Sequence, residues 1–163
     1  METITYLLIL IGVLFYPPAV LAIESYKACM HKKKLSAYEY ILCCLPLVNL
    51  IVMRKAFYGT AKIIYTSLGL IVAGIIYRTL AILVLYSNGW IVLTSSVVMM
   101  ATMVLIWLVS AYTFYDIAVC VRQGTFIKLF CIFLPPLGAY LTSKAVRPYM
   151  KSVKEELDGT FKQ

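Results

Sequence analysis

The sequence predicts an all-α integral membrane protein with three transmembrane helices and two short proline-centred segments, which form re-entrant loops or half-helices. Of its 163 residues, 63% are hydrophobic and 13% are charged, whereas a soluble domain is about half apolar and about a quarter charged. The apolar residues gather in five stretches, and two of these are short and contain proline. The 15 Lys and Arg residues outnumber the 7 Asp and Glu residues, which gives a net charge of +8. The basic residues fall almost entirely between the apolar stretches.

The first apolar stretch covers residues 4–23. It reaches the roughly 20 residues that a helix needs to cross a bilayer. Its end resembles a signal-peptidase site, but no Lys or Arg precedes the stretch, and Pro17 and Pro18 interrupt it. A cleaved signal peptide carries basic residues at its start. We therefore expect a retained transmembrane helix.

The second and fifth stretches, residues 40–53 and 129–143, are too short to cross the bilayer as regular helices. Each has proline near its centre, which removes a backbone donor and disfavours a helical conformation at the preceding residue. We expect a break where the chain turns back, with carbonyl groups that either line a polar path or remain satisfied within a kinked helix. The candidate functional or packing residues at these breaks are Pro46, Asn49, Pro135, Pro136 and Gly138.

The third and fourth stretches, residues 63–86 and 90–115, are long enough for two further spanning helices. Gly69 and Ala73, four residues apart, give the third stretch a small-residue face on which another helix can pack closely. Arg78 is the one basic residue within a full span. A charge at that depth costs at least about 2.5 kcal/mol, so we expect Arg78 either to reach the outer headgroups or to contact carbonyls or an acid from another subunit.

The distribution of basic residues decides between two topologies. If both short segments return to their side of entry, every Lys and Arg except Arg78 lies on one side of the membrane. Five transmembrane helices, the alternative, would divide the basic residues between the sides. Because basic loops stay in the cytoplasm, we expect a multi-pass protein of the cell (inner) membrane with its N-terminus outside and its C-terminus in the cytoplasm.

Three consecutive lysines, Lys32, Lys33 and Lys34, follow the first stretch. Each basic side chain near an anionic leaflet contributes about 1 kcal/mol of attraction. We therefore expect these lysines to contact lipid headgroups or another anionic surface. Binding of nucleic acid is the weaker interpretation of the same cluster.

A weak internal repeat relates residues 1–56 to residues 90–145, with residues 63–86 as the helix that joins the two copies. The repeat places Pro46 and Pro135 at equivalent positions. Because both copies enter the membrane in the same orientation, the repeat would be of the parallel kind. Residues 1–145 would then form the membrane domain, followed by a short cytoplasmic tail at 146–163.

No set of residues in the sequence matches a catalytic, cofactor-binding or metal-binding pattern, so we expect a protein that is not an enzyme and needs no cofactor. The hypothesis is a small polytopic subunit of a larger membrane assembly, which contributes to a translocation or secretion path. One alternative is a self-sufficient channel or transporter that uses the two proline-centred segments. Another is a lipid-organising or curvature protein. The expected partners are the bilayer and other membrane subunits or a second copy of the chain.

Overall fold

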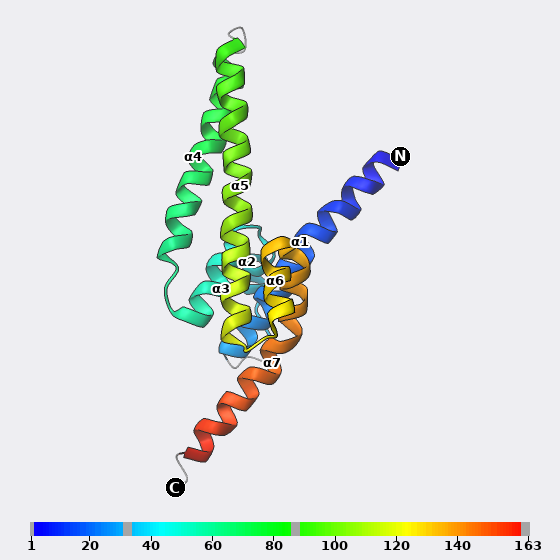
Figure 1. The fold of residues 1–163 in the computed structure, drawn as a ribbon, viewed down its shortest axis with the longest axis vertical. Coiled ribbons are helices and arrows are strands. Elements are labelled where there is room, and N and C mark those ends of the chain that lie inside the picture. Colours follow the sequence, from blue (N-terminus) through cyan, green and yellow to red (C-terminus); the bar gives the residue numbers. More distant parts are fainter. Residues whose placement is uncertain (1, 31–33, 86–88, 161–163) are drawn as a thin grey trace. The chain divides into compact units, whose positions relative to one another are not determined.

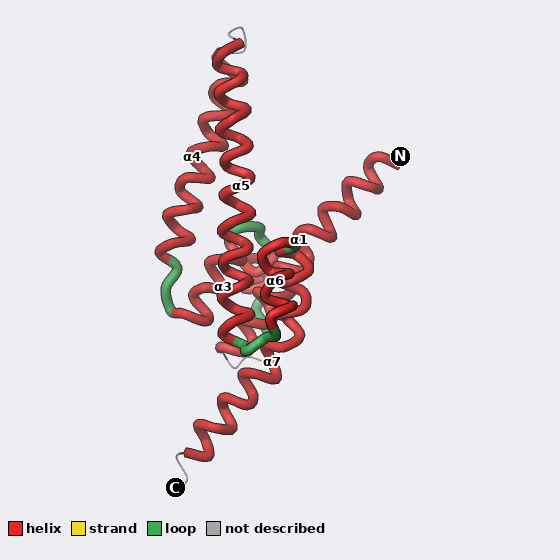
Figure 2. Tube along the Cα trace, viewed as in Figure 1, coloured by secondary structure: helices red, strands yellow, loops and turns green. Residues whose placement is uncertain are grey.

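The computed structural model describes residues 2–30, 34–85 and 89–160, and most of these residues are helical. No strand occurs among the described residues (Figure 2). The predicted all-α class is therefore confirmed. The helices, labelled in Figure 1, are α1 (Glu2–Cys29), α2 (Ala37–Cys44), α3 (Val48–Tyr58), α4 (Lys62–Leu85), α5 (Gly89–Cys120), α6 (Thr125–Phe133) and α7 (Pro135–Thr160).

Two helices are long and apolar enough to cross a membrane, α4 over Lys62–Leu83 and α5 over Gly89–Cys120. They correspond to the third and fourth apolar stretches of the sequence. A third candidate arises if α2 and α3 are counted together as one bent span. The first stretch lies within α1, which continues as a helix through its two prolines. The side chains of residues 2–11 lie outside the described part of the chain, and a crossing by α1 stays a prediction.

The chain divides into two compact units. One unit comprises Met1–Thr60 and Ala111–Gln163, and the other comprises Ala61–Ser110. The helix α5 contributes its first part to the second unit and its last three turns to the first. We describe each unit separately.

In the first unit, α1 packs against α2, α3 and α7, and α6 packs against α7. The side chains that fill this core are less than 2% exposed, and they come from helices far apart in the sequence. The largest are Phe114, Leu21, Met53, Ile117 and Val146. The core therefore depends on contacts between the beginning and the end of the chain.

The first break lies between α2 and α3, whose axes are bent by 109°. Leu45 has the extended conformation (ψ 124°) that a residue before proline adopts, and Leu47 has a positive φ of 68°. The carbonyl of Leu45 accepts a hydrogen bond from the backbone N–H of Asn49 at 3.0 Å. A break at Pro46 was expected, and this geometry suits either a broken span or a re-entrant loop.

The second break lies between α6 and α7, which are joined by Leu134 alone. Pro135 is the first residue of α7, a position where the missing N–H costs no helical hydrogen bond. Gly138 lies directly against α6, because a Cβ at this position would be 2.5 Å from both Cα and N of Cys131. The two helices can approach this closely only because Gly138 has no side chain.

The order of elements is compatible with the predicted repeat. A long helix, a short helix, a proline break and a further helix occur in α1–α3 and again in α5–α7. Pro46 and Pro135 lie at the two breaks. This order is consistent with a duplication, which remains a prediction.

In the second unit, α4 and the first part of α5 form an antiparallel helix pair. Its contact contains small and hydroxyl side chains: a Cβ at Gly74 would collide with Oγ1 of Thr102. The buried positions of α4 include Ile71 and Ala81 on either side of Gly74, a spacing typical of side chains that interdigitate between two helices. Most of the exposed side chains of both helices are apolar, which is compatible with a membrane-embedded protein.

Candidate functional site

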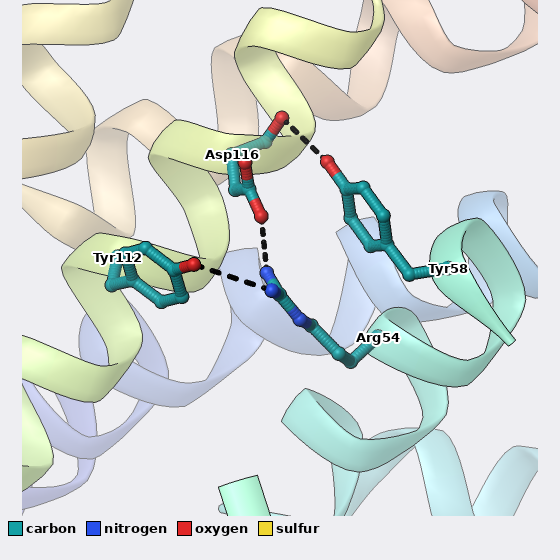
Figure 3. Close-up of polar contacts among 4 residues, drawn as sticks. All are labelled: Arg54, Tyr58, Tyr112 and Asp116. Carbon is teal, nitrogen blue, oxygen red and sulfur yellow. Dashed lines mark hydrogen bonds and ion pairs between the residues drawn. The ribbon is translucent and has the colours of Figure 1, made fainter. Parts of the chain in front are cut away.

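Four side chains in the first unit form a polar cluster, which we call the Arg54 cluster (Figure 3). Arg54 and Tyr58 come from α3, and Tyr112 and Asp116 come from the last turns of α5. Within each helix the two residues are four positions apart and therefore lie on one face. The cluster joins α3 to α5.

The guanidinium of Arg54 lies at the centre of this cluster. Its Nη1 forms an ion pair with Oδ2 of Asp116, and its Nη2 donates to the hydroxyl of Tyr112 at 3.3 Å. The hydroxyl of Tyr58 donates to the backbone carbonyl of Asp116 at 3.1 Å. The Cζ of Arg54 is 4.6 Å from the ring centroid of Tyr58 and 5.0 Å from that of Tyr112. Both rings lie within cation–π distance of the charge.

The arrangement holds two opposite charges in fixed positions. The side chain of Arg54 is 11% exposed and that of Asp116 is 27% exposed. A charge in such surroundings is stable only with a charged partner and further hydrogen bonds. The hydroxyl of Tyr112 accepts one such hydrogen bond from Arg54, and the ring of Tyr58 lies against the guanidinium. The cluster therefore suits a clamp between helices better than a site at which a substrate reacts.

A second ion pair joins the first helix to the last. Arg147 of α7 binds Glu24 of α1 through two contacts, from Nη2 to Oε1 at 3.0 Å and from Nε to Oε2. The first contact is a hydrogen bond, and the second is an ion-pair contact. The Arg147 side chain is 65% exposed, so solvent screens the pair more than it screens Arg54 and Asp116.

Together the two ion pairs follow a crossed pattern. One binds α3 to α5, and the other binds α7 to α1. Each pair therefore joins a helix of the first part of the sequence to a helix of the second part.

Arg78 lies in the second unit, where it contacts α5. Its Nη1 donates to Oγ of Ser95, to Oγ of Ser96 at 3.2 Å and to the carbonyl of Val92 at 3.4 Å. Both serine hydroxyls also donate to this carbonyl, at 2.8 and 2.9 Å. The acceptors of Arg78 are therefore a carbonyl and hydroxyls of its own chain. An acid from another subunit remains a prediction.

The candidate residues at the breaks occupy different environments. Pro46 is exposed and Asn49 is 4% exposed, while Pro135 and Gly138 are buried and Pro136 is partly buried. At both breaks the carbonyl before the proline is occupied, because Leu134 accepts from Gly138 at 3.0 Å in the same way as Leu45 accepts from Asn49. These two carbonyls belong to turns that satisfy them within the chain.

The predicted small-residue face does not form the contact between α4 and α5. Gly69 and Ala73 are exposed, and a Cβ at Gly69 would meet no atom within 4 Å. The close approach occurs instead at Gly74. In the predicted basic cluster Lys34 is exposed, while Lys32 and Lys33 lie outside the described residues.

The sequence prediction missed the Arg54 cluster and the ion pair between Arg147 and Glu24. One signal was present: Arg54 and Asp116 have opposite charges, and each has a tyrosine four residues away. Such a pattern marks residues that can pair, although it does not identify the partners. Arg54 and Asp116 are 62 positions apart, so only the tertiary fold determines that these two residues pair.

The described cysteines are free thiols. Burial raises the pKa of Cys29 to about 11, with a further increase from the nearby Cys120. Cys29 is therefore protonated at neutral pH, which makes it a poor nucleophile and a poor metal ligand. Cys131 is buried, and its Sγ lies 3.7 Å from Oγ1 of Thr142.

Among the described residues, no group of three or more His, Cys, Asp or Glu side chains could hold a metal ion. Comparison of the chain with protein-family models, curated proteins and solved structures gives no match.

Proposed function

We propose that this protein is a small, non-enzymatic subunit of a membrane assembly and that it works by packing against other membrane proteins. One observation carries the proposal: Arg54, Arg78 and Arg147 each contact a second helix through fixed hydrogen bonds or ion pairs. These arginines serve to hold helices together. The occupied carbonyls at both proline breaks favour packing over an ion path through those segments.

The exposed face of α4 offers a place for a partner. Gly69 and Ala73 are exposed on this helix. A Cβ at Gly69 would meet no atom within 4 Å, so another helix has room to approach there. In a bilayer, helices associate through close van der Waals contact, which small residues permit. A helix of another subunit, or of a second copy, could approach α4 there and support a translocation or secretion path.

Purification in a mild detergent tests this function. The intact chain should elute with other membrane proteins or as an oligomer, above the 18.4 kDa of the monomer. Gly69→Leu with Ala73→Leu should release the partner, because two bulky side chains prevent close approach. Val97→Leu, which adds bulk at an exposed position of α5, is the matched control. A stable lone monomer would contradict the proposal, and ion flux in liposomes containing this chain alone would support a channel instead.

We further propose a topology in which α1, α4 and α5 cross the membrane, while the α2–α3 and α6–α7 pairs return to the cytoplasmic side. The 109° bend between α2 and α3 is compatible with it, and the basic residues on either side of that pair support it. The N-terminus would be outside, and the C-terminus would be in the cytoplasm of a cell (inner) membrane.

Labelling of single cysteines in a cysteine-free variant tests this topology. Lys34→Cys and Thr60→Cys flank the α2–α3 pair and are both at exposed positions. An impermeant maleimide should label both only after the cells are permeabilised, because both lie in the cytoplasm. Asn88→Cys, between the two long helices, should react in intact cells. Labelling of Lys34→Cys and Thr60→Cys from opposite sides would support five spans and exclude the re-entrant arrangement.

A further inference from the structure

The side chain of Arg78 has a positive charge that its own contacts leave unbalanced. The hydrogen bonds that it makes use Nη1, and the acceptors are neutral: two serine hydroxyls and a carbonyl. Two acids of the described chain are engaged elsewhere, Asp116 with Arg54 and Glu24 with Arg147. An arginine in an apolar helix pair is costly without an anion.

The hydroxyls of α5 set the direction of the guanidinium. Ser95 and Ser96 each donate to the carbonyl of Val92 and therefore present their oxygen lone pairs to Arg78. Among the described residues, the hydrogen bonds of Arg78 use Nη1, and Nη2 and Nε remain as donors. Two donors of a planar guanidinium match the oxygens of a phosphate.

The guanidinium lies inside the end of the helix pair at which α4 ends and α5 begins. Its partners Ser95 and Ser96 follow the first residue of α5 by six and seven residues, or about 9–10 Å at a rise of 1.5 Å per residue. Trp90, in the first turn of α5, is 77% exposed, and Tyr77 beside Arg78 is 43% exposed. Tryptophan and tyrosine concentrate where headgroups meet the hydrocarbon. The long side chain of an arginine inside that boundary can extend toward the lipid phosphates.

We propose that Arg78, oriented by Ser95 and Ser96, binds the phosphate of a membrane phospholipid at the 85–89 end of the α4–α5 pair. The ligand is a phosphodiester rather than a particular headgroup, because the guanidinium is the charged group at this position. The same chemistry could attract free phosphate, but a lipid also places its acyl chains against the apolar surface of α4 and α5. Arg78 also joins α4 to α5, so the site shares this residue with the packing function proposed above, but it needs no partner subunit.

Native mass spectrometry of the delipidated full-length protein in detergent tests the site. The probes are dioleoylphosphatidylglycerol, dioleoylphosphatidylcholine, dioleoylglycerol (which lacks phosphate) and inorganic phosphate. Both phospholipids should bind, whereas dioleoylglycerol and inorganic phosphate should bind much more weakly. Arg78→Gln should reduce phospholipid affinity at least about tenfold, since a charge-assisted hydrogen bond is lost. Lys62→Gln, at the other end of the same helix, should leave affinity unchanged.

Two further variants separate orientation from charge. Arg78→Lys should restore part of the affinity, because a lysine binds phosphate as a point charge. Ser95→Ala with Ser96→Ala should weaken binding several-fold, because the guanidinium is kept but no longer oriented. Unchanged helicity in circular dichroism shows that each variant is folded. Equal phospholipid affinity of the wild type and Arg78→Gln would overturn the proposal. Equal binding of dioleoylglycerol, or equally strong binding of inorganic phosphate, would also overturn it.

Discussion

Asp116→Ala is expected to lower the free energy of unfolding by between about 2 and 4 kcal/mol. The substitution leaves Arg54, 11% exposed, without its charged partner. Asp116 is itself 27% exposed, and solvent therefore screens this ion pair in part. For this reason we expect a smaller loss of stability than for a fully buried ion pair. Unfolding of the purified protein in mixed micelles, followed by circular dichroism, measures the change.

The control is Lys151→Ala, which removes an exposed ion pair of the i, i+4 type between Lys151 and Glu155. Such a pair contributes about 0.3–0.5 kcal/mol. A double-mutant cycle with Arg54→Ala isolates the coupling to Asp116, which we expect to exceed about 1 kcal/mol. A coupling near zero would show that α3 and α5 are not held together by this ion pair.

Gly138→Ala is expected to destabilise the protein by about 2–3 kcal/mol, because the new methyl group has no space. It would lie 2.5 Å from the backbone of Cys131, and backbone atoms cannot move aside as a flexible side chain can. The helices α6 and α7 would have to separate. The same unfolding measurement should show the loss.

Gly69→Ala provides the matched comparison in another helix. Its Cβ meets no atom within 4 Å, and alanine is more favourable than glycine inside a helix by up to about 1 kcal/mol. We therefore expect a small gain in stability in the monomer. If the two glycine substitutions had equal effects, close packing at Gly138 would not be the cause.

Much of the fold follows from local features of the sequence. The apolar runs that became α4 and α5 are long and nearly free of charge, so their helical structure needed no tertiary information. Pro46 and Pro135 indicated the two breaks, because proline restricts the residue before it whatever the rest of the chain does. The same reasoning does not apply to every proline, since α7 continues as a helix through Pro148.

The candidate site depends on information that local patterns do not contain. Arg54 could have paired with Glu39, which is much closer in sequence, but Glu39 instead caps the start of α2 together with Ser36. Likewise Gly69 and Gly74 share one helix, and only the register of the helix pair places Gly74 against Thr102. Contacts between distant helices decide which residues become functional.

The crossed pairing of helices also has a consequence for biogenesis. During synthesis α1 leaves the ribosome well before its partner α7, and Glu24 therefore has no Arg147 to bind until α7 has been made. Arg54 similarly has no partner until Asp116 of α5 has been made. The helices α1 and α3 thus leave the ribosome with two charges that are still unpaired. Packing of this unit can be completed only after α5 and α7 provide both partners.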